Sequence, residues 1–301
     1  MSQNIVGVVG EGLFEIGMDP ASHFAGAFGG DAANIAVMAA RCGVGSRLAG
    51  RVGADSLGAW LRDRWTHCGV DLDHLVVDSD APTGIYTNST DTHGAHVMDY
   101  HRSGSAGSRW TGSDLRDDFF DSLGAFVFTG ITLSISASSA GAAMDGVRRA
   151  RSLGVEIAFV VNHRAKLHPD AASLATAAEA SDIVFCSEDE AVAVFGTADA
   201  IAITRRLQPS VRLILTRGGL GVTLVHGEVV SDLPAPAVHL VDAAGAGDAL
   251  AGTYLARRCM GDADHDALRL AAAVASDSVT RHGCANSYPS RAEVERLLRQ
   301  R

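Results

Sequence analysis

Short apolar runs alternate with amphipathic or alanine-rich segments along most of this chain. The apolar runs predict strands at Ile5–Val9, Ser46–Val52, Ala125–Phe128, Val155–Val161, Ile183–Cys186, Val211–Leu215 and Val222–Val225. The segments between them predict helices near residues 31–42, 56–68, 137–152, 188–195, 199–207, 248–260, 264–282 and 290–299. Such strands separated by helices indicate a mostly parallel sheet with both faces covered. We see no linker or repeat, and therefore expect a single α/β domain over residues 1–301.

Residues 82–107 depart from this alternation of strands and helices. Gly84–Asn88 and Ala95–Tyr100 have the pattern of two strands, and the polar loop between them contains a glycine. Two strands joined in this way form a β-hairpin. A hairpin inserted into a chain of alternating strands and helices is expected to project from the main sheet.

The segment at residues 238–259 has the pattern of strand, glycine turn and helix. Val238–Val241 is the strand candidate, and the helix is expected to start at about Asp248. Gly245 and Gly247 leave no side chain above the peptide N–H groups of the first helical turn, which can therefore bind an anion. Asp248 beside such a site could take a proton from a hydroxyl. The alternative is an ordinary tight turn in which Asp248 is only the N-cap.

A second glycine turn precedes the helix at residues 31–42. Gly29 and Gly30 form the turn, Asp31 is a candidate cap, and Asn34 falls in the first helical turn. Asn34 could reach a ligand above the glycines, or it could be bonded locally. The earlier cluster GVVGEG at residues 7–12 has the reverse of the dinucleotide-binding spacing, and no helix start follows it.

Three further places carry candidate chemistry. Arg164 directly follows a strand, where open α/β sheets place their ligands. Ser187 and Glu190 lie at an acidic helix start, where the carboxylate could bind a cation or only complement the helix dipole. The turn at residues 216–222 contains GGLG, which taken alone is a weak signal.

Composition narrows the classes of protein. The 301 residues are 47% hydrophobic, which is enough for a full core. Five cysteines without a C-x-x-C pair suggest free thiols in a reducing cytoplasm. A net charge of −10 argues against nucleic-acid binding, and no long apolar span indicates a membrane segment.

The motif DAAGAGD at residues 242–248 resembles the Asp-Thr-x-Gly-Ala-Gly-Asp signature of the ribokinase-like (PfkB) carbohydrate kinases, with Ala243 in place of Thr. The resemblance implies that Asp248 is the catalytic base and that Gly245, Ala246 and Gly247 form the anion hole. Gly29, Gly30 and Asn34 resemble the signature that holds sugar hydroxyls. The family's Asn-x-x-Glu motif implies that Glu190 organises Mg²⁺ around the phosphates of ATP. The resemblance further places four residues on the nucleotide side: Ser187, Thr216, Gly218 and Gly221.

Other details are similar to 2-keto-3-deoxygluconate kinases more than to ribokinases. In that group the residues at the positions of Tyr86, Tyr100 and Arg102 contact the acid sugar. Arg164 matches a second arginine of the group, and an arginine fork can bond both carboxylate oxygens. Val160 and His168 depart from the Asp and Trp of that motif, so the substrate could differ from the group's usual one.

The resemblance implies a ribokinase-like fold with a small β-strand lid formed by segments near residues 11–28 and 82–107. It also implies a cytoplasmic kinase that transfers the γ-phosphate of ATP to a sugar acid, 2-keto-3-deoxygluconate above all. We expect a homodimer or higher homo-oligomer joined through the lid, with no nucleic-acid or membrane partner. A neutral-sugar kinase of fructokinase or ribokinase type is one alternative, and a sugar-binding regulator without catalysis is the other.

Overall fold

The computed structural model describes residues 4–18, 24–90, 96–167, 170–208 and 210–299. Its strands are β1 (Ile5–Val9), β2 (Leu13–Met18), β3 (Phe24–Gly29), β4 (Gly45–Gly53), β5 (Val70–Asp71), β6 (Leu75–Asp78), β7 (Ile85–Thr90), β8 (His96–His101), β9 (Leu123–Thr129), β10 (Glu156–Val160), β11 (Ile183–Ser187), β12 (Arg212–Thr216), β13 (Val222–His226) and β14 (Val229–Leu233). Its α-helices are α1 (Asp31–Arg41), α2 (Ser56–His67), α3 (Gly130–Ile135), α4 (Ala137–Ser152), α5 (Ala171–Glu179), α6 (Glu188–Phe195), α7 (Ala200–Arg206), α8 (Ala246–Cys259), α9 (Asp264–Ser278) and α10 (Arg291–Arg299).

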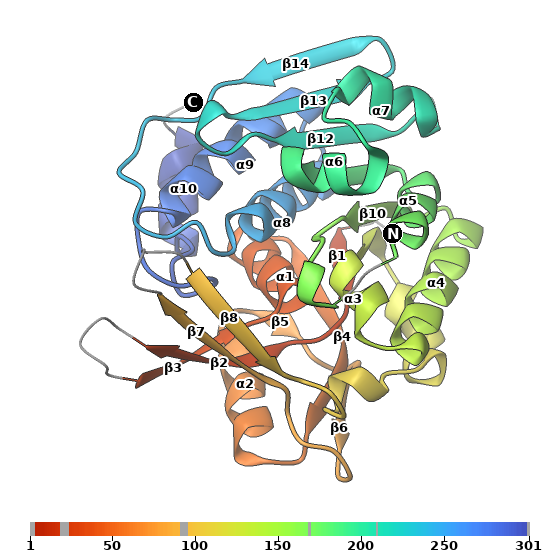
Figure 1. Cartoon of the computed structure of the whole chain (residues 1–301), viewed down its shortest axis with the longest axis vertical. Coiled ribbons are helices and arrows are strands. Elements are labelled where there is room, and N and C mark those ends of the chain that lie inside the picture. The colour runs from red at the N-terminus through yellow and green to blue at the C-terminus, as the bar shows by residue number, and fades with distance from the viewer. Residues whose placement is uncertain (1–3, 19–23, 91–95, 168–169, 209, 300–301) are drawn as a thin grey trace.

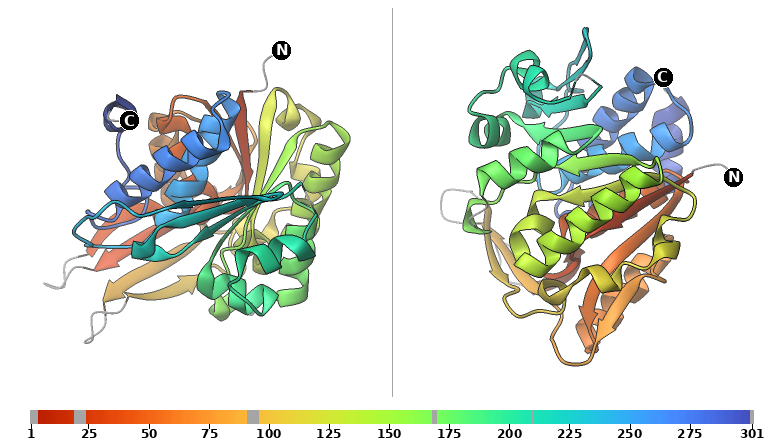
Figure 2. Two further views of the ribbon diagram at one scale, coloured as in Figure 1. Left: turned by 90° about the horizontal axis from the view of Figure 1, so that it is seen from above. Right: turned by 90° about the vertical axis from the view of Figure 1, so that its right-hand side faces the viewer.

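A large sheet crosses the molecule in the order β14-β13-β12-β11-β10-β9-β1-β4-β5, with β6 also paired to β4 (Figure 1). The pairs from β12 through β1 to β5 and β6 are parallel, and only β13 and β14 run antiparallel. The expectation of a mostly parallel sheet is therefore confirmed. Helices cover both faces of this sheet (Figure 2).

Alternate residues of the central strands enter two separate cores. Ala125 and Val127 of β9 pack on the side of α1, α8 and α9, whereas Phe126 and Phe128 pack on the side of α4 and α5. A strand turns successive side chains to opposite faces, so an apolar residue at every position supplies both cores. Phe128 also packs on Phe159 of β10, with ring centroids 4.8 Å apart.

The predicted hairpin is present and belongs to a second sheet of four strands, in the order β3-β2-β7-β8. β7 and β8 are antiparallel, as are β2 and β3, whereas β2 and β7 run parallel. Both segments expected to form a lid therefore lie in one small sheet. It projects from the body of the molecule on the side where α1 and α8 begin (Figure 1).

Some predictions of elements were wrong. Val238–Val241 is not a strand, and Val238 and Leu240 are 44% and 64% exposed. The backbone N–H of Val241 instead donates to the carbonyl of Val279 at 2.8 Å, beyond the end of α9. The segment therefore uses its backbone to anchor the chain to the end of α9 and does not pair with a strand. The pattern also missed α3, α5, β14 and the short β5 and β6.

Within the described residues no helix is both long and apolar enough to cross a membrane. The five cysteines are free, and three of them are buried.

The close approach of α1 and α8 depends on a glycine. A Cβ at Gly252 of α8 would lie 2.6 Å from the carbonyl oxygen of Ile35 and 3.0 Å from the Cβ of Met38, both on α1. This contact sets the distance between the N-terminal turns of the two helices, which hold Asn34 and Asp248.

We expect Gly252→Ala to lower stability by ~1–3 kcal/mol, because forced overpacking outweighs a helix-propensity gain of about 1 kcal/mol. Chemical denaturation measures the change. Gly141→Ala in α4 is the matched control, because a Cβ there meets nothing within 4 Å. Equal stability changes in the two variants would contradict this account of the helix contact.

Candidate active site

A cleft of about 290 Å³ lies between the small sheet and the C-terminal ends of β10, β11 and β12, where α1 and α8 begin. Helix N-termini and strand C-termini meet at this end of the sheet, as they do in other open α/β folds. Most of the predicted site residues line the cleft: Gly30, Asn34, Tyr86, Tyr100, Arg102, Arg164, Ser187, Glu190, Thr216, Gly245, Gly247 and Asp248.

Four predicted residues do not line it: Gly29, Gly218, Gly221 and Ala246. Gly29 lies behind Tyr86, and a Cβ there would be 2.3 Å from the tyrosine hydroxyl. Gly221 shapes the turn between β12 and β13, with a φ of 109° and no room for a Cβ beside the carbonyl of Leu233. These glycines act on the shape of the backbone around the cleft.

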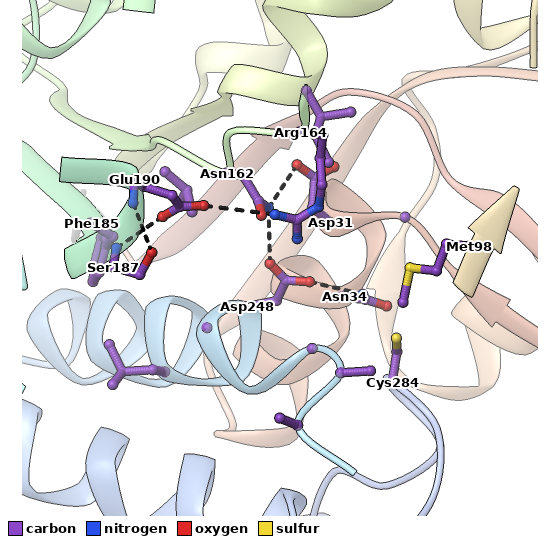
Figure 3. Close-up of a pocket in the computed structure, with 18 of the residues that line it drawn as sticks. Asp31, Asn34, Met98, Asn162, Arg164, Phe185, Ser187, Glu190, Asp248 and Cys284 are labelled. Carbon is purple, nitrogen blue, oxygen red and sulfur yellow. Dashed lines mark hydrogen bonds and ion pairs between the residues drawn. The ribbon is translucent and has the colours of Figure 1, made fainter. Parts of the chain in front are cut away.

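Asp248 lies at the centre of the cleft, on the first turn of α8 (Figure 3). The helix begins at Ala246 and its N-cap is Gly245, so the alternative of Asp248 as an N-cap is wrong. The carboxylate is 8% exposed and accepts two amide N–H groups, from Asn34 at 2.9 Å and from Asn162 at 3.3 Å. These two bonds hold both oxygens of a buried carboxylate in place.

A second carboxylate lies beside Asp248. The Asn162 side-chain amide also donates to Asp31 at 3.0 Å and therefore bridges the two acids. Burial, followed by the negative charge of Asp31, raises the pKa of Asp248 to about 7, and the bond from Asn34 opposes the shift. A carboxyl group with such a pKa can exchange a proton with a ligand at neutral pH. Asn162 has a φ of 39°, a strained conformation of the kind found at functional sites.

The start of α8 has the backbone geometry that the expected anion site requires. Gly245 has a φ of 76°, which glycine adopts without strain, and its carbonyl accepts the Tyr288 hydroxyl at 2.7 Å. A Cβ on Gly247 would meet nothing within 4 Å, so the backbone there is open to the cleft. The N–H groups of Gly247 and Asp248 precede the first intrahelical bond and are available to an anion. Ala246 contributes less than expected, because its N–H donates to the Ala243 carbonyl at 3.3 Å.

The sequence suggested Asp31 as the cap of α1, and this prediction was wrong. The N-cap is Gly30, and Asp31 is the first helical residue. One Asp31 oxygen accepts the neighbouring Ala32 N–H at 2.8 Å, and the other accepts Asn162. The side chain therefore faces the cleft and contributes charge to it.

Glu190 forms a capping box with Ser187 at the start of α6. One of its oxygens accepts the Ser187 N–H at 2.9 Å and the other accepts the His163 N–H at 3.0 Å. Each carboxylate oxygen has a second lone pair, so Glu190 can also hold a water or a cation. No group of three or more His, Cys, Asp or Glu side chains in the described residues could bind a metal alone.

The end of the cleft under the small sheet holds Tyr86, Tyr100 and Arg102. Each of two buried carboxylates holds one of these residues: Glu15 accepts the Tyr86 hydroxyl, and Glu11 forms an ion pair with Arg102. The Arg102 guanidinium also lies 5.6 Å from the Tyr100 ring centroid. The charge of Arg102 is therefore balanced before any ligand is present.

Arg164, unlike Arg102, is exposed, and no carboxylate of the described residues is in close contact with it. Its side chain is 42% exposed, and its nearest carboxylate in the described residues is Glu190, at 3.7 Å. Val160 lines the cleft where the resembled motif has an aspartate, which leaves the guanidinium open to a ligand. His168, the other departure, lies outside the described residues.

Sequence reasoning missed several contributors to the site. Glu11, Glu15, Asn162 and Tyr288 were assigned no role, although each contacts a predicted site residue. Glu11 stood in a glycine cluster that was considered only as a dinucleotide motif. Asn162 follows a strand, as Arg164 does, and it matches the asparagine of the resembled Asp-x-Asn-x-Arg motif, although no role was given to it.

Comparisons with known proteins agree with this geometry. A 2-dehydro-3-deoxygluconokinase of Thermoproteus tenax is 31% identical over 281 residues, which cover 90% of this chain and 85% of that protein. A fructokinase of Klebsiella pneumoniae is 28% identical and covers 97% of this chain and 98% of its own. Among solved structures, a fructokinase with bound ATP from Xylella fastidiosa superposes with a TM-score of 0.90 at 25% identity, covering 100% of this chain and 99% of that one.

The expected ribokinase-like fold, with its mostly parallel central sheet flanked by helices, is thereby confirmed. The sequence profile of the pfkB family carbohydrate kinases matches residues 8–291. Since this match spans nearly the whole chain and includes every element of the cleft, the protein belongs to the PfkB family of carbohydrate kinases and is a sugar-phosphorylating enzyme.

Proposed function

We propose that this enzyme transfers the γ-phosphate of ATP to a hydroxyl of a sugar acid, with Asp248 as the general base. The observation that carries the proposal is the position of Asp248, a buried carboxylate with a pKa near neutrality, next to the free N–H groups that begin α8. A base and an anion site side by side are what phosphoryl transfer to a hydroxyl requires.

The proposed step follows from these positions. Asp248 accepts the proton of the sugar hydroxyl while the hydroxyl oxygen forms a bond to the γ-phosphorus of ATP. The bond from that phosphorus to the bridging oxygen of ADP breaks in the same step. Asn34 and Asn162 keep the carboxylate oriented, and the N–H groups of Gly247 and Asp248 stabilise the charge on the transferred group. Catalysis then depends mainly on positioning and electrostatics.

The nucleotide side of the cleft fits a metal–phosphate ligand. Mg²⁺ keeps several waters and takes one or two protein carboxylates together with phosphate oxygens, which suits the single carboxylate of Glu190. When bound with ATP, it would offset the charge of the phosphates. Ser187 and Thr216 line the same end of the cleft and would face the nucleotide.

Two observations support a sugar acid, 2-keto-3-deoxygluconate above all. Arg164 presents an exposed guanidinium to the cleft, and this group can bond both oxygens of a carboxylate. Relatives named as kinases of deoxy keto-sugar acids include the Thermoproteus tenax protein and a 2-dehydro-3-deoxygalactonokinase of Haloferax volcanii, 28% identical over 284 residues.

A neutral sugar is the second candidate, because the ion pair of Arg102 with Glu11 leaves the end of the cleft under the small sheet without a spare cation. Fructokinases are similar to this chain at comparable identity.

The small sheet would serve as the lid over the sugar, because Tyr86 and Tyr100 of β7 and β8 line the cleft. Association of two copies through this sheet stays a prediction. Phe24 at its edge is 72% exposed and offers apolar surface for such a contact.

The central experiment measures ADP release with a panel of sugars and sugar acids. We expect a sugar acid to give the highest kcat/KM, and Asp248→Asn to lower kcat by about two orders of magnitude or more, because the amide cannot accept the proton. ATP binding by the variant, measured by calorimetry, should be retained. Preferred turnover of fructose would replace the acid assignment, and near-normal turnover by Asp248→Asn would remove the base from the mechanism.

A second prediction concerns Glu190. We expect Glu190→Gln to raise the Mg²⁺ concentration needed for half-maximal rate severalfold, because the amide has no charge to offer the cation or its waters. The comparison variant is Ser187→Ala, which removes the other half of the capping box without removing a charge. If both variants shift the Mg²⁺ requirement equally, Glu190 acts only as a helix cap.

A third prediction follows from the carboxylate pair. Asp248 must be ionised to act as a base, so kcat/KM should fall as the pH drops through about 7. Asp31→Asn removes the neighbouring negative charge that raises the pKa, and the acid limb should move down by about one pH unit. Asp145→Asn on α4, away from the cleft, should leave the profile in place. An acid limb unmoved by Asp31→Asn would mean that burial alone sets the pKa.

A further inference from the structure

Glu11 is a buried carboxylate that the proposed mechanism does not use. It follows β1, is 2% exposed, and accepts the Ser105 hydroxyl on one oxygen at 2.7 Å. Its other oxygen pairs with the guanidinium of Arg102. Burial raises the pKa of Glu11, and the charge of Arg102 opposes that shift.

The surroundings of Glu11 are built closely around this pair. A Cβ at Gly107 would lie 2.4 Å from a Glu11 carboxylate oxygen, and a Cβ at Gly84 would lie 2.7 Å from the same oxygen. A side chain at either glycine would collide with the carboxylate, so both positions leave room for Glu11 beside Arg102. Arg102 lines the cleft, and Glu11 lies behind it.

Arg102 reaches the cleft with its charge already compensated. Its side chain is 7% exposed, whereas that of Arg164 is 42% exposed. Asp31 and Asp248 add two further carboxylates to the same cleft. In a cleft that holds both arginines and carboxylates, removing one negative charge strongly changes the affinity for an anionic ligand relative to a neutral one.

We propose that Glu11 is a specificity-determining residue, because its carboxylate neutralises the charge of Arg102 at the sugar end of the cleft. Arg102 then serves the substrate as a hydrogen-bond donor through its remaining N–H groups, and Arg164 is the counter-ion for a substrate carboxylate. The inference rests on the proposed function, since it assigns the sugar to this cleft.

The test compares ligands that differ only in charge. D-gluconate and D-glucitol have the same six-carbon chain, ending in a carboxylate or in a CH₂OH group. Calorimetry on the full chain gives the ratio of their dissociation constants without any need for turnover. We expect Glu11→Gln to shift this ratio toward gluconate by about tenfold or more, because the guanidinium is left without its counter-charge.

The double variant Glu11→Gln with Arg102→Gln decides between the two roles of Arg102. It replaces an ion pair by two amides of similar size, a change that buried pairs often tolerate. If Glu11 neutralises the charge of Arg102, the double variant should keep the wild-type ratio of the two dissociation constants within about threefold. If Arg102 is instead the counter-ion of the carboxylate, the ratio should collapse toward glucitol by about tenfold or more, and the inference is overturned.

A control variant and the folded single variant complete the test. Ser105→Ala removes a neutral partner of Glu11 and should leave the ratio unchanged. A ratio that stays within threefold of wild type in a folded Glu11→Gln variant overturns the inference, and if that variant fails to fold, the double variant decides alone. Failure of the proposed function has a different signature: the wild-type protein would release no ADP with any sugar.

Discussion

The site depends on keeping buried carboxylates supplied with hydrogen-bond donors. Asp248 is held by amides from two other parts of the chain, Asn34 on α1 and Asn162 after β10. A buried charge without such partners would be too costly to remain ionised. The positions of α1, α8 and the end of β10 are therefore tied together at one point, which is also where we propose that the reaction takes place.

The same principle organises the rest of the cleft. Glu190 accepts backbone N–H groups from two segments, Glu15 is bound by Tyr86 and Asn88, and Glu11 is bound by Ser105 and Arg102. Each acid fixes a neighbour that faces the ligand. Small residues make these contacts possible, because Gly252 lets α8 approach α1 and Gly245 lets the chain turn into α8.

The charges of the cleft give its two ends different properties. At the start of α8, backbone N–H groups without an intrahelical partner face the cleft, which suits phosphate. At the end under the small sheet, the buried Arg102 is paired with Glu11. A protein with a net charge of −10 thus presents hydrogen-bond donors to the cleft without a general excess of positive charge.

The chain by itself determined the architecture and singled out the residue proposed as the base. Continuous apolar runs that alternate with helical segments are local patterns, and they predicted the parallel sheet and most of its helices correctly. Glycine turns before helices are local as well, and they made Gly245, Gly247, Asp248 and Asn34 candidates, which the resemblance to the kinase signatures then favoured. Only the tertiary structure decided which charges meet, because an ion pair such as Glu11 with Arg102 joins residues far apart in sequence and leaves no periodic trace. The same holds for the bridge from Asn162 to Asp31 and Asp248. It holds too for Val238–Val241, whose composition favours a strand but whose backbone bonds to the end of α9 at Val279.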